Sequence, residues 1–236
     1  SDEEDFDEDF DFDEDGADGG GGGDDDEFEF DSRYILPPRP QEIKEQFLKY
    51  KYAKDLAASI KLFRDCRYFV VVNGSFYFGD FIEAIIAAYN FHVKKMTIST
   101  LSLNQNNVDS LGNLLEGGFV DELDLIVSDY FYQHERRNLV EYIYKELDTG
   151  NRFQLAAART HCKTCIFETH DGVFLCIHGS ANLRTSDNLE QIVIEDNRAL
   201  YQWLNEWQSA LVEKYKTINK KIPNRGNELW QTVQTA

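Results

Sequence analysis

Two short polar segments in the second half of the chain carry residue types that can act on a phosphate ester. The first is His161-Cys162-Lys163, and the second, sixteen positions further on, is Gly179-Ser180-Ala181-Asn182. An imidazole can attack phosphorus or transfer a proton. An ammonium group can balance the charge of phosphate oxygens, while a hydroxyl and an amide can form hydrogen bonds to them. Together the two segments predict a site for a phosphodiester.

The stretch between the segments predicts a β-hairpin that brings them together. It is mostly apolar, β-branched or aromatic, and it is interrupted once by Asp171-Gly172, which is a strong hairpin signal. A two-residue loop there would place His161 opposite Asn182 and Lys163 opposite Ser180. Because side chains alternate along a strand, we expect these four side chains to share one face of the hairpin.

The segments and the residues after them resemble the signature of the phospholipase D superfamily, which reads H-x-K-x4-D, then G-S-x-N, then N-x-E. The residues of this chain that stand at those positions are His161, Lys163, Glu168, Gly179, Ser180, Asn182, Asn188 and Glu190. Glu168 replaces the aspartate of the family, and in the predicted hairpin it points to the face opposite His161. The combination of these motifs with an intervening hairpin is specific, whereas H-x-K alone is not.

The resemblance implies a reaction and a role for each residue. His161 would attack phosphorus to form a phospho-histidine, and His161 of a second subunit would protonate the leaving oxygen and then activate water. Lys163, Ser180 and Asn182 would bind the phosphate oxygens, and Glu190 would fix the imidazole tautomer. The reaction would need neither a metal nor another cofactor.

A second H-x-K sequence, His92-Val93-Lys94, has no G-S-x-N within the next thirty residues. It follows an expected helix, so we interpret its side chains as partners for the carbonyl groups at the helix C-terminus. The chain therefore carries one motif, whereas the family reaction uses two. The resemblance thus implies a homodimer with paired half-sites, and twofold dimers are the commonest homo-oligomers.

Further polar residues accompany the motifs. His178 shares the face of His161 in the predicted hairpin, and Asn188 belongs to the N-x-E sequence. Arg184 and Arg159 flank the two segments and could contact the substrate backbone or lie on the surface without such a role. We interpret His178, Asn188 and Arg184, together with Glu168, as supporting residues of the site.

The cysteines are too sparse and too irregularly spaced for a disulfide scaffold. They are Cys66, Cys162, Cys165 and Cys176. An alternative zinc site would use Cys165, Cys176 and His178, but Lys163 would crowd a dication there. Buried, reduced thiols are the simpler interpretation, and they favour an intracellular, cytoplasmic protein.

Charge divides the chain of 236 residues into unequal parts. Residues 1–31 hold 18 acidic residues and no Lys or Arg, which leaves 25 acidic residues against 24 basic ones in the remainder. We expect a disordered acidic tail over residues 1–32, a proline-rich linker over 33–40, and one domain over 41–236. The tail could bind a basic protein, increase solubility, or mimic a nucleic-acid backbone and cover the site.

Hydrophobic periodicity predicts alternating strands and helices in the domain. Strands are expected over residues 68–72, 96–103, 123–128, 153–158 and 190–195, beside the hairpin at 161–178, and helices over 41–64, 81–91, 106–116, 136–147 and 198–215. This order predicts an α/β fold with a mixed, largely parallel sheet and helices on both faces.

The sequence contains no apolar run long enough to span a membrane and no signal peptide, so we expect no membrane partner. Family members with one motif resemble nucleases more often than lipid enzymes. We therefore expect a metal-independent phosphodiesterase, a nuclease that cleaves DNA without reading its bases. The alternatives are a non-catalytic nucleic-acid binder that keeps the phosphate pocket, and an adaptor that recruits a partner through its tail.

Overall fold

The structure is a computed structural model that describes residues 44–218, except 51, 63–65, 74–75 and 185–187. For residues 44–50 it describes only the backbone. The predicted tail over 1–32 and linker over 33–40 lie outside the described residues.

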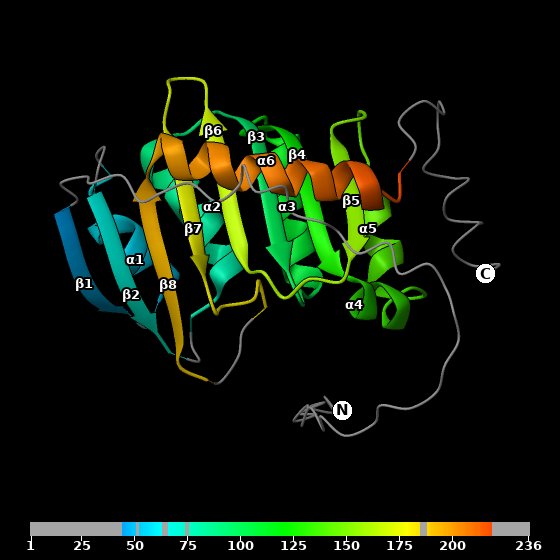
Figure 1. The fold of residues 1–236 in the computed structure, drawn as a ribbon, viewed down its shortest axis with the longest axis horizontal. Coiled ribbons are helices and arrows are strands. Elements are labelled where there is room, and N and C mark those ends of the chain that lie inside the picture. Colours follow the sequence, from blue (N-terminus) through cyan, green and yellow to red (C-terminus); the bar gives the residue numbers. More distant parts are fainter. Residues whose placement is uncertain (1–43, 51, 63–65, 74–75, 185–187, 219–236) are drawn as a thin grey trace. The chain divides into compact units, whose positions relative to one another are not determined.

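The described residues form eight strands and six helices (Figure 1). The strands are β1 Lys44–Tyr50, β2 Cys66–Val72, β3 Val93–Thr100, β4 Val120–Ser128, β5 Phe153–Ala158, β6 Thr164–Thr169, β7 Phe174–Gly179 and β8 Glu190–Asp196. The helices are α1 Ala53–Ser59, α2 Phe78–Tyr89, α3 Gln105–Glu116, α4 Asp129–His134, α5 Leu139–Leu147 and α6 Arg198–Tyr215. One sheet contains all of these strands, in the order β1-β2-β8-β7-β6-β3-β4-β5.

The sheet is mixed, as expected, but it is not largely parallel. The pairs β1–β2, β3–β4 and β4–β5 are parallel, whereas β2–β8, β8–β7, β7–β6 and β6–β3 are antiparallel. The prediction was wrong because three consecutive strands, β6 to β8, return by short connections and insert between β2 and β3. Short connections between adjacent strands require antiparallel pairing.

One end of the sheet gathers the polar motifs, and we call it the motif end. There β2, β3, β4, β5 and β7 finish, while β6 and β8 begin, as follows from the strand directions (Figure 1). Side chains at this end come from the carboxyl ends of several strands and from the connections after them. In open α/β sheets such carboxyl ends commonly carry the ligand site.

Helices cover both faces of the sheet, as the alternating pattern predicted. Helix α6 crosses one face over β5, β6 and β7, while α1, α2, α3 and α5 lie behind the sheet in Figure 1. The core on the side of these four helices includes Leu56, Ile82, Ile98, Val108, Ile143 and Phe153. A smaller set of buried residues lies between the sheet and α6, including Ile126, Ile166, Cys176, Leu204 and Trp207.

The helix predicted over residues 41–64 is wrong. Residues 44–50 form β1, which pairs in parallel with β2, and among the described residues of this range only α1, over 53–59, is helical. The apolar spacing was compatible with a helix, but pairing with a buried strand satisfies the backbone of this segment. Local periodicity does not contain that long-range choice.

The hairpin of β6 and β7 forms as predicted, but its register differs by one residue. Thr169 pairs with Val173 through a backbone hydrogen bond of 3.0 Å, which leaves a three-residue loop that ends at Gly172 with φ +90°. Thr164 consequently pairs with His178, whereas the predicted register paired it with Gly179. A glycine in the left-handed region is typical of such three-residue loops. The shift moves each predicted partner to the other face.

Candidate active site

The segment with His161 and Lys163 lies along the motif end, between the end of β5 and the start of β6 (Figure 1). Ser99, the second-last residue of β3, donates a hydrogen bond of 2.9 Å to the carbonyl of Cys162. The ammonium of Lys163 approaches the carbonyl oxygen of His161 at 3.4 Å. His161 is exposed and Lys163 is half-buried, so both side chains remain accessible to a substrate.

A backbone contact joins the two motifs. The amide of Gly179 donates a hydrogen bond of 3.2 Å to the carbonyl of Lys163. A Cβ atom on Gly179 would lie 2.0 Å from the carbonyl oxygen of Gln191, a separation that real Cβ atoms do not show. The glycine of the second motif is therefore required because β8 passes directly against its backbone.

Ser180 connects the second motif to the third. Its hydroxyl donates a hydrogen bond to the carboxylate of Glu190 and accepts one of 3.0 Å from the amide of Gln191. The Ser180 amide also donates to the carbonyl of Gln191 at 2.9 Å. Glu190, which the family resemblance implied would orient the imidazole of His161, thus contacts the hydroxyl expected to bind phosphate.

Asn182 connects the second motif to the end of β3. Its side-chain oxygen accepts a hydrogen bond of 3.1 Å from the amide of Leu101 and lies 3.4 Å from the hydroxyl of Thr100. The same hydroxyl accepts a hydrogen bond of 3.2 Å from the amide of Leu183. Thr100 was missed by the sequence reasoning, which extended this strand to Leu103, although a hydroxyl after an apolar strand was a visible signal.

The predicted pairing of His161 with Asn182 and of Lys163 with Ser180 is wrong. Both residues of the first motif precede β6, and Lys163 lies against Gly179. The motif residues meet at one end of the sheet through the β3 end and the backbone contact, not as four side chains on one face of a hairpin.

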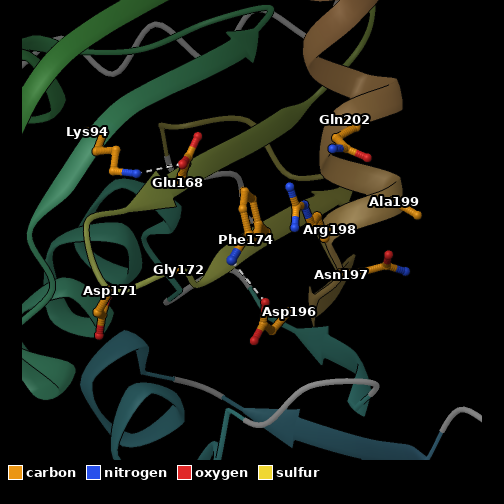
Figure 2. A pocket seen from close by; sticks show the side chains of 10 residues that line it. All are labelled: Lys94, Glu168, Asp171, Gly172, Phe174, Asp196, Asn197, Arg198, Ala199 and Gln202. Carbon is orange, nitrogen blue, oxygen red and sulfur yellow. Dashed lines mark hydrogen bonds and ion pairs between the residues drawn. The ribbon is translucent and has the colours of Figure 1, made fainter.

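Glu168, which we expected to support the site, lies at the opposite end of the sheet from His161. Its carboxylate forms an ion pair of 2.8 Å with Lys94, which belongs to the second H-x-K sequence (Figure 2). Both residues line a cavity of about 590 Å³ formed with the hairpin loop and the first turn of α6. Lys94 lies in β3 and pairs with this carboxylate, not with carbonyl groups at a helix C-terminus as expected. The C-terminus of the preceding helix, α2, is capped by Asn90 with φ 50°.

His178 lies beside a buried carboxylate on the face of the sheet that α6 covers. Its Nε2 atom is 3.8 Å from Glu195, to which Arg67 donates two hydrogen bonds of 3.1 Å and Asn197 one of 3.0 Å. Burial raises the pKa of Glu195, but the hydrogen bonds of His178, Arg67 and Asn197 outweigh it and lower this pKa to about 2. His178 therefore extends from the motif end of β7 towards an ion-pair cluster formed where β2 begins and β8 ends.

The alternative zinc site is contradicted by the register. Cys176 pairs with Ile166, so Cys165 and Cys176 lie on opposite faces of the hairpin and cannot share an ion. Both thiols are buried, which raises their pKa values, whereas Cys162 is exposed. Among the residues that the structure describes, no group of three or more His, Cys, Asp or Glu side chains is placed to hold a metal ion.

Arg184 and Asn188 flank residues 185–187, which lie outside the described residues, in the connection between β7 and β8. Both are exposed at the motif end. Within the described ranges, no helix is long and apolar enough to cross a membrane.

No protein-family model matches this sequence, and no curated protein matches it either. Several solved structures are similar to it. A phospholipase D family member, Nuc from Salmonella typhimurium, is 17% identical with a TM-score of 0.40, over 52% of this chain and 80% of that one. Phosphatidylserine synthase from Haemophilus influenzae is 15% identical with a TM-score of 0.44, over 72% of this chain and 44% of that one.

Polyphosphate kinase from Porphyromonas gingivalis is 13% identical with a TM-score of 0.47, over 61% of this chain. The match spans only 26% of that kinase. At these identities, any assignment of a reaction rests on the residues of this chain. In its motifs, and again among solved structures, the chain is similar to proteins of the phospholipase D family.

Proposed function

We propose that this protein is a phosphodiesterase of the phospholipase D type, a nuclease that hydrolyses the nucleic-acid backbone in a homodimeric site. The observation that carries the proposal is the hydrogen bond between Gly179 and Lys163, because it joins the two motifs at one end of the sheet. His161, Lys163, Ser180 and Asn182 then come from one small region, together with Glu190.

In the first step, a ring nitrogen of His161 attacks phosphorus, and a phosphorus–nitrogen bond forms as the bond to the leaving oxygen breaks. That oxygen takes a proton from His161 of the second subunit. In the second step, the same imidazole removes a proton from water, whose oxygen attacks phosphorus and breaks the phosphorus–nitrogen bond. Each histidine ends in its starting state, so the cycle balances.

Positive charge at the site comes from Lys163 of both subunits, which would bind the non-bridging oxygens as they gain charge. Asn182 supplies an amide that can donate to the same group, and Ser180 would do so once its hydroxyl turns from Glu190 to a phosphate oxygen. No step of this scheme calls for a metal ion.

The second subunit follows from the count of motifs in the described part of the chain. His92 and Lys94 lie at the start of β3, whereas His161 lies beyond its end, so they cannot complete the same site. A two-histidine reaction then needs His161 from another copy, and a twofold axis at the motif end would supply it.

A nucleic acid is the substrate that the surroundings of the site favour. Arg159 and Arg184 are exposed on either side of the motif segments and offer charge to neighbouring phosphates. We propose DNA as the substrate, cleaved without base specificity.

The test compares the parent with His161→Asn on a plasmid and on a bis-aryl phosphodiester, in excess EDTA. We expect the parent alone to cleave both substrates and to show the mass of a dimer by gel filtration with light scattering. A radiolabelled phosphate ester should leave an acid-labile, base-stable label on the parent and none on His161→Asn.

Three results would contradict the proposal. Cleavage that stops with EDTA would indicate a metal nuclease, and a monomer with full activity would exclude the paired site. DNA binding that is equal in both proteins, without cleavage of either substrate, would favour a non-catalytic binder.

A further inference from the structure

Exposed aromatic and apolar side chains of the described residues are concentrated at the motif end. The large ones that remain exposed are Tyr52, Val71, Tyr77, Tyr130 and Leu189. Val71 is the second-last residue of β2, Tyr130 lies at the start of α4, and Tyr52, Tyr77 and Leu189 lie in connections at that end. Scattered exposed apolar residues are ordinary, but a concentration around a polar site indicates a binding surface.

Tyr130, in α4, is the best-defined member of this group. Its side chain is 51% exposed, and its ring stacks on His134 with a centroid distance of 3.7 Å and an interplanar angle of 27°. The Nδ1 atom of His134 donates a hydrogen bond of 2.8 Å to the carbonyl of Tyr130, which holds the imidazole against the phenol ring. The pair forms a flat surface that is fixed before a ligand arrives.

Arg159 lies beside this pair and close to the motif. Its side chain is 87% exposed, and its Nε atom is 3.4 Å from Asp129, the residue before Tyr130. The other carboxylate oxygen of Asp129 accepts a hydrogen bond of 2.8 Å from the amide of Tyr130. Asp129 therefore orients the guanidinium towards the start of α4.

The geometry points to a docking platform for single-stranded nucleic acid, formed by Tyr130, His134 and Arg159. We call it the tyrosine platform, and it rests on the function proposed above. Arg159 lies two positions before His161, which corresponds to at most about 7 Å of chain. A strand whose scissile phosphate lies at Lys163 would thus have its neighbouring nucleotide at the platform. The base would stack on Tyr130 while Arg159 contacts the phosphate.

Stacking explains why a single strand is preferred to a duplex. The bases of a duplex are already stacked and paired, so an aromatic ring on a protein surface reaches them only after they are unpaired. An unpaired strand presents the face of each base, and stacking of this kind tolerates any base. The platform therefore adds strand selectivity without base selectivity.

The experiment measures binding by fluorescence anisotropy in the full-length His161→Asn protein, which prevents cleavage. The probes are a labelled twelve-residue oligothymidylate and a hairpin duplex of equal phosphate number. We expect tighter binding of the single strand, and Tyr130→Ala should weaken it about tenfold with little effect on the duplex. Tyr130→Phe is the matched control, since it keeps the ring, and should bind within about twofold of Tyr130.

Arg159→Ala provides a second variant. The Arg159 side chain is exposed, so its removal should not disturb the packing of the protein. It should weaken binding of both probes and reduce the slope of log K against log salt by about one. The tyrosine platform would be overturned if the His161→Asn protein bound oligothymidylate equally tightly with and without Tyr130→Ala, provided that the two proteins have the same melting temperature. Tighter binding of the duplex, or binding to phosphatidylglycerol vesicles that depends on Tyr130, would overturn it as well.

The platform and the proposed function fail separately. Turnover of the bis-aryl phosphodiester by the parent decides the function, whereas the binding measurements decide the platform. An active parent with no preference for single strands would leave the chemistry intact and remove the platform alone.

Discussion

The side-chain oxygen of Asn182 accepts a hydrogen bond of 3.1 Å from the backbone amide of Leu101. This contact fixes the second motif to the chain that follows β3. It also orients the side-chain amide, because only its oxygen can accept from a backbone N–H group. The NH₂ group is then the part of Asn182 that can donate to a phosphate oxygen.

Asn182→Asp should separate anchoring from catalysis. The aspartate keeps an oxygen that can accept from Leu101, but it replaces the donor with an oxygen that repels phosphate. We expect a loss of about a hundredfold or more in turnover of the bis-aryl phosphodiester, with a melting temperature close to that of the parent. Asn182→Ala should in addition lower the free energy of unfolding by about 1 kcal/mol. Full activity of Asn182→Asp would show that this amide does not bind the phosphate.

Gly179→Ala should damage the join between the motifs. The added methyl would meet the backbone of Gln191 and Ile192, which cannot move without opening the β7–β8 pair. We expect the free energy of unfolding to fall by about 1–3 kcal/mol in urea titrations. Gly112→Ala is the control, since a methyl there would lie 3.8 Å from Leu147, in ordinary contact, and alanine favours the helix. Equal effects of the two substitutions would contradict the close approach at Gly179.

Acid should destabilise the protein partly through Glu195, whose side chain is 3% exposed. Its pKa is about 2 when folded, because the hydrogen bonds of His178, Arg67 and Asn197 outweigh burial, and about 4.3 when unfolded. The stabilisation is complete above pH 4.3 and is lost as the pH falls towards 2. The lowering of this pKa corresponds to about 3 kcal/mol in the free energy of unfolding.

Glu195→Gln should therefore be less stable than the parent at pH 7. The difference between their free energies of unfolding should become smaller as the pH falls from 4.3 to 2. Denaturant titrations at several pH values measure it. Glu122→Gln, which alters an exposed carboxylate of β4, is the control and should track the parent. A gap that is constant with pH would show that the carboxylate charge of Glu195 is not what stabilises the cluster.

Glu168→Gln should leave catalysis unchanged despite its place in the motif. Its carboxylate pairs with Lys94 at the end of the sheet opposite His161, and both side chains are partly exposed. We expect turnover within about twofold of the parent and a loss of stability below about 1 kcal/mol. Lys94→Gln should behave in the same way, since it breaks the same ion pair. A hundredfold loss of activity in Glu168→Gln alone would restore the role that the motif suggested.

Much of the fold was predictable because it depends on local signals. Helix α6 has the predicted bounds, and the strands over 153–158 and 190–196 differ by at most one residue from the expected ranges. The hairpin was visible in Asp171-Gly172. The helix expected over 41–64 failed because β1 is specified by its partner β2, which lies in another part of the chain.

The candidate site was predictable only as a set of residues. The sequence by itself determined that His161, Lys163, Ser180 and Asn182 surround a β-hairpin, since both motifs and the turn lie within one short stretch. It could not determine their contacts. A three-residue loop moved the register by one position, and a single step in a strand exchanges its two faces.

Tertiary structure alone decided how the site is assembled. The end of β3 positions Asn182 and the backbone of Cys162 through residues that are about sixty to eighty positions away. Glu168 pairs with Lys94 at the other end of the sheet. Tyr130 lies at the motif end because α4 directly follows β4. These contacts depend on which strands pair and in which direction. Strand pairing is set by burial of the whole sheet between its two layers of helices, and no short stretch of sequence encodes it.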